Sequence, residues 1–359
     1  MELLWYIILM TMLIIYVILD GYDFGAGIIH LFFAKDEDDK KTIIRAIGPF
    51  WDANEVWIIA GGGVLFFTFP ILYASAFSGF YLPLIMILWL LIFRAIGIEL
   101  RHHVANDMWR AVWDKAFGIS SLLLALFFGI ALGNIVRGVN LGGVIDGVSN
   151  YEPIYFFLPL WNSSFSPQAQ ELGVIDWFTL LLGVIGVVSL TIHGANWIIF
   201  KTNSKLIPKL KNVVFNLNIV LFVLTIFTLL VWHIINPTPF KNFFTYPLLW
   251  VFPILTFIGI GGLFKVKTYK KSGKGFLFSS LFLVGGLSAT IASIFPKFLP
   301  STNTVNPSLT IENTVTGNYG LSTGIVWFAI GILLIIAYLI FQYRIFSGKI
   351  DTIAYGEEH

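Results

Sequence analysis

Long apolar runs separated by short polar segments extend along nearly the whole chain. A helix that crosses a membrane needs about 20 predominantly apolar residues, and this measure selects nine stretches. They lie at roughly 3–33, 54–74, 76–98, 115–136, 177–200, 213–235, 247–266, 275–297 and 320–345, with scarcely a loop between the second and the third. The pattern therefore predicts an all-α polytopic membrane protein with nine transmembrane helices.

A faint internal repeat divides these helices into two halves. Asp20-Gly21-x-Asp23 stands near the end of the first predicted helix, and His193-Gly194-x-Asn196 stands at a comparable depth in the fifth. Parallel repeats of this kind occur in membrane proteins. We therefore expect two four-helix bundles and one peripheral helix. The corresponding segments are 1–136 for the first bundle, 137–176 for an extracytoplasmic loop, 177–297 for the second bundle, 298–319 for a second such loop, and 320–359 for the ninth helix and a cytoplasmic tail.

The composition agrees with this class and excludes others. Hydrophobic residues make up 57% of the 359 residues and charged residues only 12%, an apolar excess that soluble domains do not need. The 22 basic and 20 acidic residues nearly balance, so we expect no nucleic-acid partner. The absence of cysteine excludes disulfides and thiolate-held iron–sulfur clusters.

Lysine and arginine determine the predicted orientation, because positively charged loops stay cytoplasmic. The alternate segments on one side hold Lys35, Lys40, Lys41, Arg45, Arg101, Arg110, Lys115, Lys201, Lys205, Lys209, Lys211, Lys265, Lys267, Lys270, Lys271, Lys274, Arg344 and Lys349. The intervening segments hold only Arg137, Lys241 and Lys297. The N-terminus is therefore expected outside and the C-terminus in the cytoplasm.

The strongly polar residues of the predicted spans all lie toward the cytoplasm. An ionised group at mid-membrane is costly, and it usually faces a protein interior or a water-filled path. The candidates are Asp20 and Asp23 in the first helix, Trp51, Asp52 and Glu55 at the start of the second, Arg94 and Glu99 near the end of the third, and His193 and Asn196 in the fifth.

Structural roles compete with functional ones at two of these places. Asp20 and Asp23, three residues apart, share one helix face, while Gly21 and Gly25 form a small-residue pair that lets a neighbouring backbone approach closely. The alternative for the two acids is that they only pair with Arg94. For Asp52 the alternative is a helix cap, because Glu55 follows three residues later as in a capping box.

Histidines decide whether this chain could hold a haem. Of the six, only His193 lies well inside a predicted span, and a lone histidine is more often a hydrogen-bonded packing residue than a ligand. We expect no haem or other metal to be ligated by this chain. The residues alone leave two functions open: a carrier with an inward-facing polar site, or an accessory subunit that supplies a proton path to chemistry housed elsewhere.

Several motifs resemble one family in order along the chain. They are "DGYDFGAG", "GPFWDANEVW", "YASAFSGFY", "FRAIGIELR", "DWFTLLLG", "HGANW" and "FPKFLPSTN" with "NPSLTI". Together they resemble subunit II of cytochrome bd quinol oxidase over nearly the whole chain. Ala53 stands where glycine is expected and Leu100 where an aromatic residue is expected, and neither position carries an ionisable group.

The resemblance implies two four-helix bundles with a peripheral helix and a pseudo-symmetric pairing with a homologous subunit I. That partner would carry two b-type haems, a d-type haem and the quinol site, and small single-helix subunits and a structural quinone can accompany it. The complex would oxidise quinol and reduce oxygen to water in a bacterial or archaeal cytoplasmic membrane. The alternative is a stand-alone ion-coupled secondary transporter with an inward-facing carboxylate site.

On this interpretation the polar residues divide into two groups. Proton-pathway candidates are Asp52, Asp23, Asp20 and Glu55, with Asp52 first. Candidates for the subunit interface or its support are Trp51, Arg94, Glu99, Gly21, Gly25 and Gly27.

Overall fold

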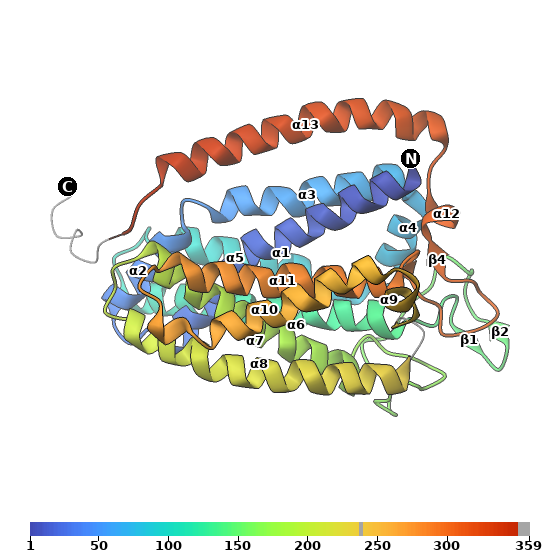
Figure 1. Cartoon of the computed structure of the whole chain (residues 1–359), viewed down its shortest axis with the longest axis horizontal. Coiled ribbons are helices and arrows are strands. Elements are labelled where there is room, and N and C mark those ends of the chain that lie inside the picture. Colours follow the sequence, from blue (N-terminus) through green and yellow to red (C-terminus); the bar gives the residue numbers. More distant parts are fainter. Residues whose placement is uncertain (237–239, 351–359) are drawn as a thin grey trace.

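The computed structural model describes residues 1–236 and 240–350, and these form one elongated group of nearly parallel helices (Figure 1). The long helices are α1 (Glu2–Phe32), α3 (Trp51–Thr68), α5 (Tyr81–Leu100), α6 (Asp107–Arg137), α7 (Trp177–Lys201), α8 (Ile207–Ile235), α11 (Gly273–Ile294) and α13 (Asn318–Ile345). The predicted all-helical membrane class is confirmed. The part of the tail predicted beyond residue 350 lies outside the described residues.

The described residues contain seven helices long and apolar enough to cross a membrane, or eight if α3 and α4 (Pro70–Gly79) count as one span. The seventh predicted span, 247–266, is shorter: η2 (Pro247–Trp250) leads into α10 (Val251–Leu263). The second predicted span was wrong beyond Thr68, because α4 turns away from α3 by 117°. Pro70 begins α4, and its missing N–H and fixed φ suit a helix start and not a continuation of α3.

Shorter elements occupy the two ends of the helix group. At the end that we call the basic end lie α2 (Glu37–Ile47), η3 (Val266–Thr268) and the loops that carry most lysines. Asp36 caps α2 by accepting the Asp39 N–H at 2.9 Å. The opposite end, the loop end, holds α9 (Lys241–Thr245), α12 (Ile311–Thr314) and four short strands (Figure 1). Strand β1 (Val144–Ile145) pairs antiparallel with β2 (Val148–Ser149), and β3 (Lys297–Leu299) with β4 (Leu309–Thr310).

Helix α1 lies at the centre, against α3, α6, α7 and α11. Its crossing with α7 depends on glycine: a Cβ on Gly25 would lie 1.9 Å from Leu190 O and 2.7 Å from the backbone nitrogen of Gly194. Gly21 of α1 faces the Leu190 side chain of α7, and Gly27 of α1 faces Ser121 of α6. The three glycines therefore support packing within this chain and lie away from its surface. The internal repeat aligns Gly21 with Gly194 in the sequence. In the structure the glycine of α1 that contacts Gly194 is Gly25, about one helical turn after Gly21.

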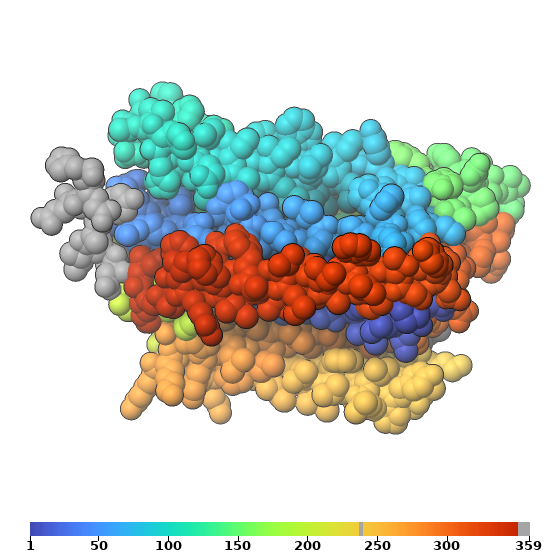
Figure 2. Space-filling model, turned by 90° about the horizontal axis from the view of Figure 1, so that it is seen from above, coloured from blue at the N-terminus to red at the C-terminus, as the bar shows by residue number. Residues whose placement is uncertain are grey.

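Helix α13 lies along the outside of the helix group, over α3 (Figure 2). The most apolar 18-residue window of this helix contains no residue buried inside the chain. Leu321 near its start is buried, and the indole N–H of Trp5 donates to the Leu321 carbonyl at 3.3 Å. The middle of α13 thus presents an apolar surface on its outer side, while Phe328, Ile332 and Ile335 on its inner side pack against the helix group.

Candidate functional site

Arg94 of α5 is fully buried and contacts carboxyl groups from two other helices. Its Nη1 donates to Asp20 Oδ1 of α1 at 2.5 Å, and its Nη2 donates to Glu55 of α3. The guanidinium carbon lies 4.7 Å from the centroid of the Phe24 ring. Asp20 is as buried as Arg94, whereas 23% of the Glu55 side chain is exposed. We call Arg94, Asp20, Glu55 and the neighbouring Asp23 the buried arginine cluster.

This cluster holds more carboxyl groups than one guanidinium can neutralise. Asp20 Oδ2, Asp23 Oδ1 and Arg94 Nε are buried and have no hydrogen-bond partner among the described residues. Such atoms are costly in a closed interior and are commonly met by internal water. The cluster can therefore exchange protons or hold water, which a fully satisfied salt bridge cannot do as readily.

Asn54, one residue before Glu55, connects Asp23 to two tyrosines. Its Nδ2 lies 2.8 Å from Asp23 Oδ2 and 2.7 Å from the Tyr22 hydroxyl oxygen. The Tyr343 hydroxyl of α13 lies 3.2 Å from Asn54 Oδ1 and 2.8 Å from the Tyr22 hydroxyl. Sequence reasoning missed Asn54 and Tyr343. Asn54 carries a signal, a polar residue between two acids, but Tyr343 lies 289 residues away and carries none.

The remaining pathway and interface candidates lie toward the basic end. Asp52 is exposed in the first turn of α3. The structure contradicts its capping alternative, because α3 begins at Trp51 after Phe50 and no side chain caps it. Trp51 is half-buried, and Glu99 is exposed at the end of α5 and does not join the buried arginine cluster. Asp52 and Glu55, three residues apart, share one face of α3.

Both ring nitrogens of the buried His193 have partners within the chain. Its Nε2 lies 2.8 Å from the Ile18 carbonyl, which only accepts, so Nε2 carries the hydrogen. Its Nδ1 lies 2.8 Å from the Ser279 hydroxyl. The other buried histidine, His30, bonds Asp114 through Nε2, and the remaining described histidines are exposed. His193 would have to give up one of these bonds to ligate a haem iron, and no group of three His, Cys, Asp or Glu among the described residues could hold a metal ion.

A second cluster, at the basic end, was not predicted. Asp114 of α6 accepts from Arg101 at 2.5 Å, from Lys40 at 2.9 Å and from the His30 ring at 2.8 Å. Arg101 also donates to both oxygens of Glu37 in α2 at 2.9 Å. These contacts tie α1, α2 and the start of α6 together. Because these residues come from four separate segments of the chain, no spacing within one segment indicates the cluster.

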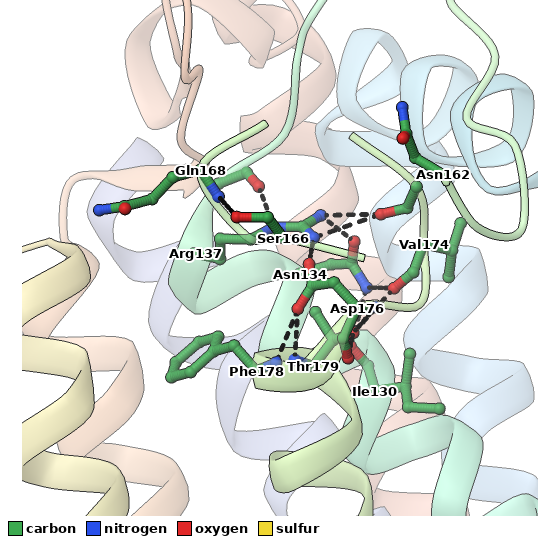
Figure 3. Close-up of polar contacts among 12 residues, drawn as sticks. Ile130, Asn134, Arg137, Asn162, Ser166, Gln168, Val174, Asp176, Phe178 and Thr179 are labelled. Atoms are coloured by element: carbon green, nitrogen blue, oxygen red, sulfur yellow. Dashed lines mark hydrogen bonds and ion pairs between the residues drawn. The ribbon is translucent and has the colours of Figure 1, made fainter. Parts of the chain in front are cut away.

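A third buried charge lies at the loop end (Figure 3). Arg137, the last residue of α6, pairs with Asp176 and donates to Asn134 Oδ1 at 2.6 Å. It also donates to the carbonyls of Gly138 and Gly173, at 3.0 and 3.2 Å. Asp176 in turn caps α7 by accepting the N–H groups of Phe178 and Thr179. We call this the loop-end arginine cluster; its charges and donors are satisfied.

Two hollows accompany these clusters. A polar cavity of about 680 Å³ lies at the loop end, and its walls include Arg137, Asn140, Asn242 and Lys297. An apolar cavity of about 420 Å³ lies between α13 and the helices α1 and α3, against Trp5 and Trp327. Neither reaches the buried arginine cluster.

The sequence was compared with known families and proteins. The model of the family described as cytochrome bd terminal oxidase subunit II matches residues 1–346. This chain belongs to that family. The resemblance found from the motifs is thereby confirmed, and the chain is a component of a membrane-bound oxidoreductase of electron transport.

Subunit II relatives match along nearly their full length. Cytochrome bd-I ubiquinol oxidase subunit 2 of Escherichia coli is 28% identical over 378 residues, which cover 97% of this chain and 94% of that protein. Cytochrome bd ubiquinol oxidase subunit 2 of Bacillus subtilis is 27% identical over 349 residues, with 97% and 96% covered. A probable cytochrome oxidase subunit 2 of Haemophilus influenzae is 28% identical over 374 residues, with 97% and 95% covered.

A solved structure shares the fold. A chain of the bd oxidase from Geobacillus thermodenitrificans superposes with a TM-score of 0.62, covering 96% of this chain and 98% of that one. Its sequence identity is 12%, so the likeness concerns the fold alone.

Proposed function

We propose that this subunit II chain is the haem-free half of a terminal oxidase that oxidises quinol and reduces oxygen to water. Its partner is a homologous subunit I that holds the b-type and d-type haems and the quinol site. The observation that carries the proposal is the match of the subunit II family to residues 1–346, together with a buried cluster rich in carboxyl groups. Stabilising subunit I and supplying protons are the two tasks that these residues suit.

The proton route that we propose starts at the basic end. Apart from Arg94, 18 of the 21 lysines and arginines belong to the segments on that side, which supports a cytoplasmic basic end and an N-terminus outside. Asp52 is exposed there and can take protons from water. Glu55, on the same face and partly exposed, can pass them inward to the site where Arg94 holds Asp20. Asp23 adds a further carboxyl group beside Asp20 that can accept or release a proton.

The haem-free assignment rests on the histidines. Ligating His193 would break its bonds to Ile18 and Ser279. Haem supplies electron transfer and oxygen binding in such complexes, and this chain contributes groups that hold and move protons. We also propose small single-helix subunits as partners of the complex, and the apolar cavity beneath α13 is compatible with a structural quinone. The stand-alone transporter considered from the sequence finds no support in the relatives.

Co-purification tests the proposal. The chain should be purified by an affinity tag from cells that also carry the gene of its subunit I, and from cells that lack it. We expect haem absorption bands and quinol-driven oxygen consumption only when subunit I is present, with the haem signals intact in His193→Ala. A colourless monomer that transports an ion by itself, or loss of one haem spectrum in His193→Ala with the complex otherwise intact, would contradict the proposal.

A further inference from the structure

The outer helix α13 enters the polar interior at one place, its last turn. Tyr343 is partly buried there, and its hydroxyl contacts Tyr22 of α1 and Asn54 of α3. The next residue toward the N-terminus, Gln342, donates instead to the Pro49 carbonyl. Two neighbouring side chains thus anchor the same turn, and only one of them reaches the polar network around Asp23.

The three contacts among Tyr343, Tyr22 and Asn54 have one consistent arrangement of hydrogens. The amide Nδ2 only donates and Oδ1 only accepts, whereas each tyrosine hydroxyl donates once. Asn54 Nδ2 therefore donates to the Tyr22 oxygen, and the Tyr343 hydroxyl donates to Asn54 Oδ1. The Tyr22 hydrogen is then left for the Tyr343 oxygen, at 2.8 Å. The result is a closed hydrogen-bonded ring of three side chains from three helices.

The Leu19 carbonyl, which only accepts, lies 3.2 Å from Asn54 Nδ2 and sets which side of the Asn54 amide faces Asp23. Tyr343 holds the opposite side of the amide through Oδ1, and this keeps Nδ2 aimed at Asp23 Oδ2, at 2.8 Å. A reversed amide would place Oδ1 against that carboxyl oxygen. An N–H donor favours the ionised form of a carboxyl group over its protonated form. Tyr343 thus influences, through Asn54, how readily Asp23 gives up a proton.

Aromatic packing keeps the two hydroxyls in place. The Tyr22 ring stacks on Trp197 with centroids 4.0 Å apart and planes 15° apart. The Tyr343 ring lies 4.7 Å from Phe50, centroid to centroid. Trp197 is itself held, because its indole N–H donates to the Ala46 carbonyl at 2.9 Å. Neither tyrosine hydroxyl can leave the hydrogen-bonded ring without disturbing this aromatic packing.

We propose that Tyr343 is a positioning residue for Asp23, acting through the hydrogen-bonded ring with Tyr22 and Asn54. This inference rests on the proposed function, in which Asp23 belongs to the proton-exchanging cluster. A helix that otherwise lies on the outside of the chain then takes part in proton supply through one hydroxyl group.

The test is Tyr343→Phe in the assembled oxidase, with quinol-driven oxygen consumption measured from about pH 6 to pH 9. Phenylalanine keeps the aromatic packing and removes the hydroxyl. We expect the pH profile to move upward by about one unit, because an Asn54 amide released by Tyr343 no longer donates steadily to Asp23, and the loss of one hydrogen bond to a charged group has about that effect. The KM for quinol should stay unchanged. Gln342→Ala is the matched control, since it releases the same turn without touching Asn54, and it should keep the parent profile.

Two outcomes overturn the positioning role. One is a parent profile in Tyr343→Phe, and the other is an equal loss of activity in Tyr343→Phe and Gln342→Ala without displacement on the pH axis. If Tyr343→Phe does not assemble, Tyr343→Leu also removes the hydroxyl, with a smaller side chain, and should give the same displacement; a parent profile there also overturns the role.

Asp23→Asn separates this inference from the proposed function. If Asp23→Asn keeps the parent rate and profile, Asp23 is not part of the proton route. If Asp23→Asn changes the profile whereas both tyrosine variants keep it, the route stands and only the positioning role fails.

Discussion

The buried arginine cluster and the loop-end arginine cluster both hold an arginine away from water, but they differ in how completely its neighbours satisfy the polar groups. Each places a fully buried arginine at a junction of helices. Around Arg137 stand one carboxylate, one amide and two backbone carbonyls, and the carboxylate of Asp176 also caps α7. Around Arg94 stand Asp20 and Glu55, with Asp23 close by, and several polar atoms lack partners among the described residues.

From this difference we propose that Arg137 serves structure and that the buried arginine cluster around Arg94 serves proton exchange. A satisfied ion pair gains nothing from a change in protonation, because every donor already has an acceptor. An excess of carboxyl groups around one cation leaves protons to be exchanged, and like-charged carboxyl groups cannot all ionise cheaply in a buried site. We therefore expect substitutions at the two arginines to affect different measurements.

The largest effect is expected from Arg94→Gln. Removing the cation leaves Asp20 buried and unpaired, a change that typically costs about 3–5 kcal/mol. The yield of assembled complex should fall, and oxygen consumption per complex should fall about tenfold or more, because a positioned proton-transfer group typically contributes 10²–10⁴-fold. Arg94→Gln combined with Asp20→Asn should restore assembly without restoring activity. Normal turnover in either variant would contradict a role of the buried arginine cluster in proton supply.

Arg137→Ala should separate stability from activity. It leaves Asp176 buried without its cation, so the complex should be less stable, again by about 3–5 kcal/mol. Oxygen consumption per haem in the complexes that survive should match the parent. The measurements are thermal unfolding and turnover normalised to haem absorption. A pH profile altered in the surviving complexes would show that the loop-end arginine cluster also takes part in the chemistry.

A smaller effect is expected from Asp52→Asn. Since Asp52 does not cap α3, a cap role no longer accounts for it, and a proton-collecting role predicts slower oxygen consumption toward high pH, where protons are scarce. The haems should remain present and reducible by quinol. Steady-state rates from about pH 6 to pH 9 are the measurement. Rates equal to the parent throughout would assign Asp52 to the surface and move proton collection to Glu55.

The smallest effect is expected from Lys205→Ala at the basic end. Lys205 Nζ lies 2.7 Å from Asp36, and this bond lowers the pKa of Asp36 and raises the pKa of Lys205. The stabilisation is therefore lost only as the pH falls below the usual range of Asp36 or rises above that of Lys205. Both groups are exposed, and such pairs contribute little. Thermal unfolding should be nearly unchanged and independent of pH between about 5 and 9; a clear loss would contradict this ranking.

Helix lengths were predictable because apolar length has a direct physical meaning in a membrane, and the ends of α1, α7 and α13 fall within two residues of prediction. Pro70 by itself favours a helix break. The apolar residues on both sides of Pro70 nevertheless led to the prediction of one continuous span. Helix α2 was missed because its 11 residues are too polar for a span.

The site was predictable only where one helix carried the signal. Asp20 and Asp23 interrupt an apolar helix, and Arg94 stood as the available cation, so their proximity could be anticipated. Gly25 indicated that another helix packs closely on α1, but it did not indicate which helix; the structure shows that it is α7. Asn54 and Tyr343 could not be paired, since a hydroxyl on a distant helix has no sequence pattern that points to one amide.

The separation of Asn54 and Tyr343 also has a consequence for the making of the protein. The 289 residues that follow Asn54 up to Tyr343 take a ribosome about 15 to 60 s to add at ordinary rates of synthesis. Through that interval α1 and α3 can already lie in the membrane, with the Asn54 amide held only by the Leu19 carbonyl and Asp23 of α1. Asn54 Oδ1 receives its donor from Tyr343 only when α13 arrives, so this polar network is among the last parts of the nascent chain to be completed.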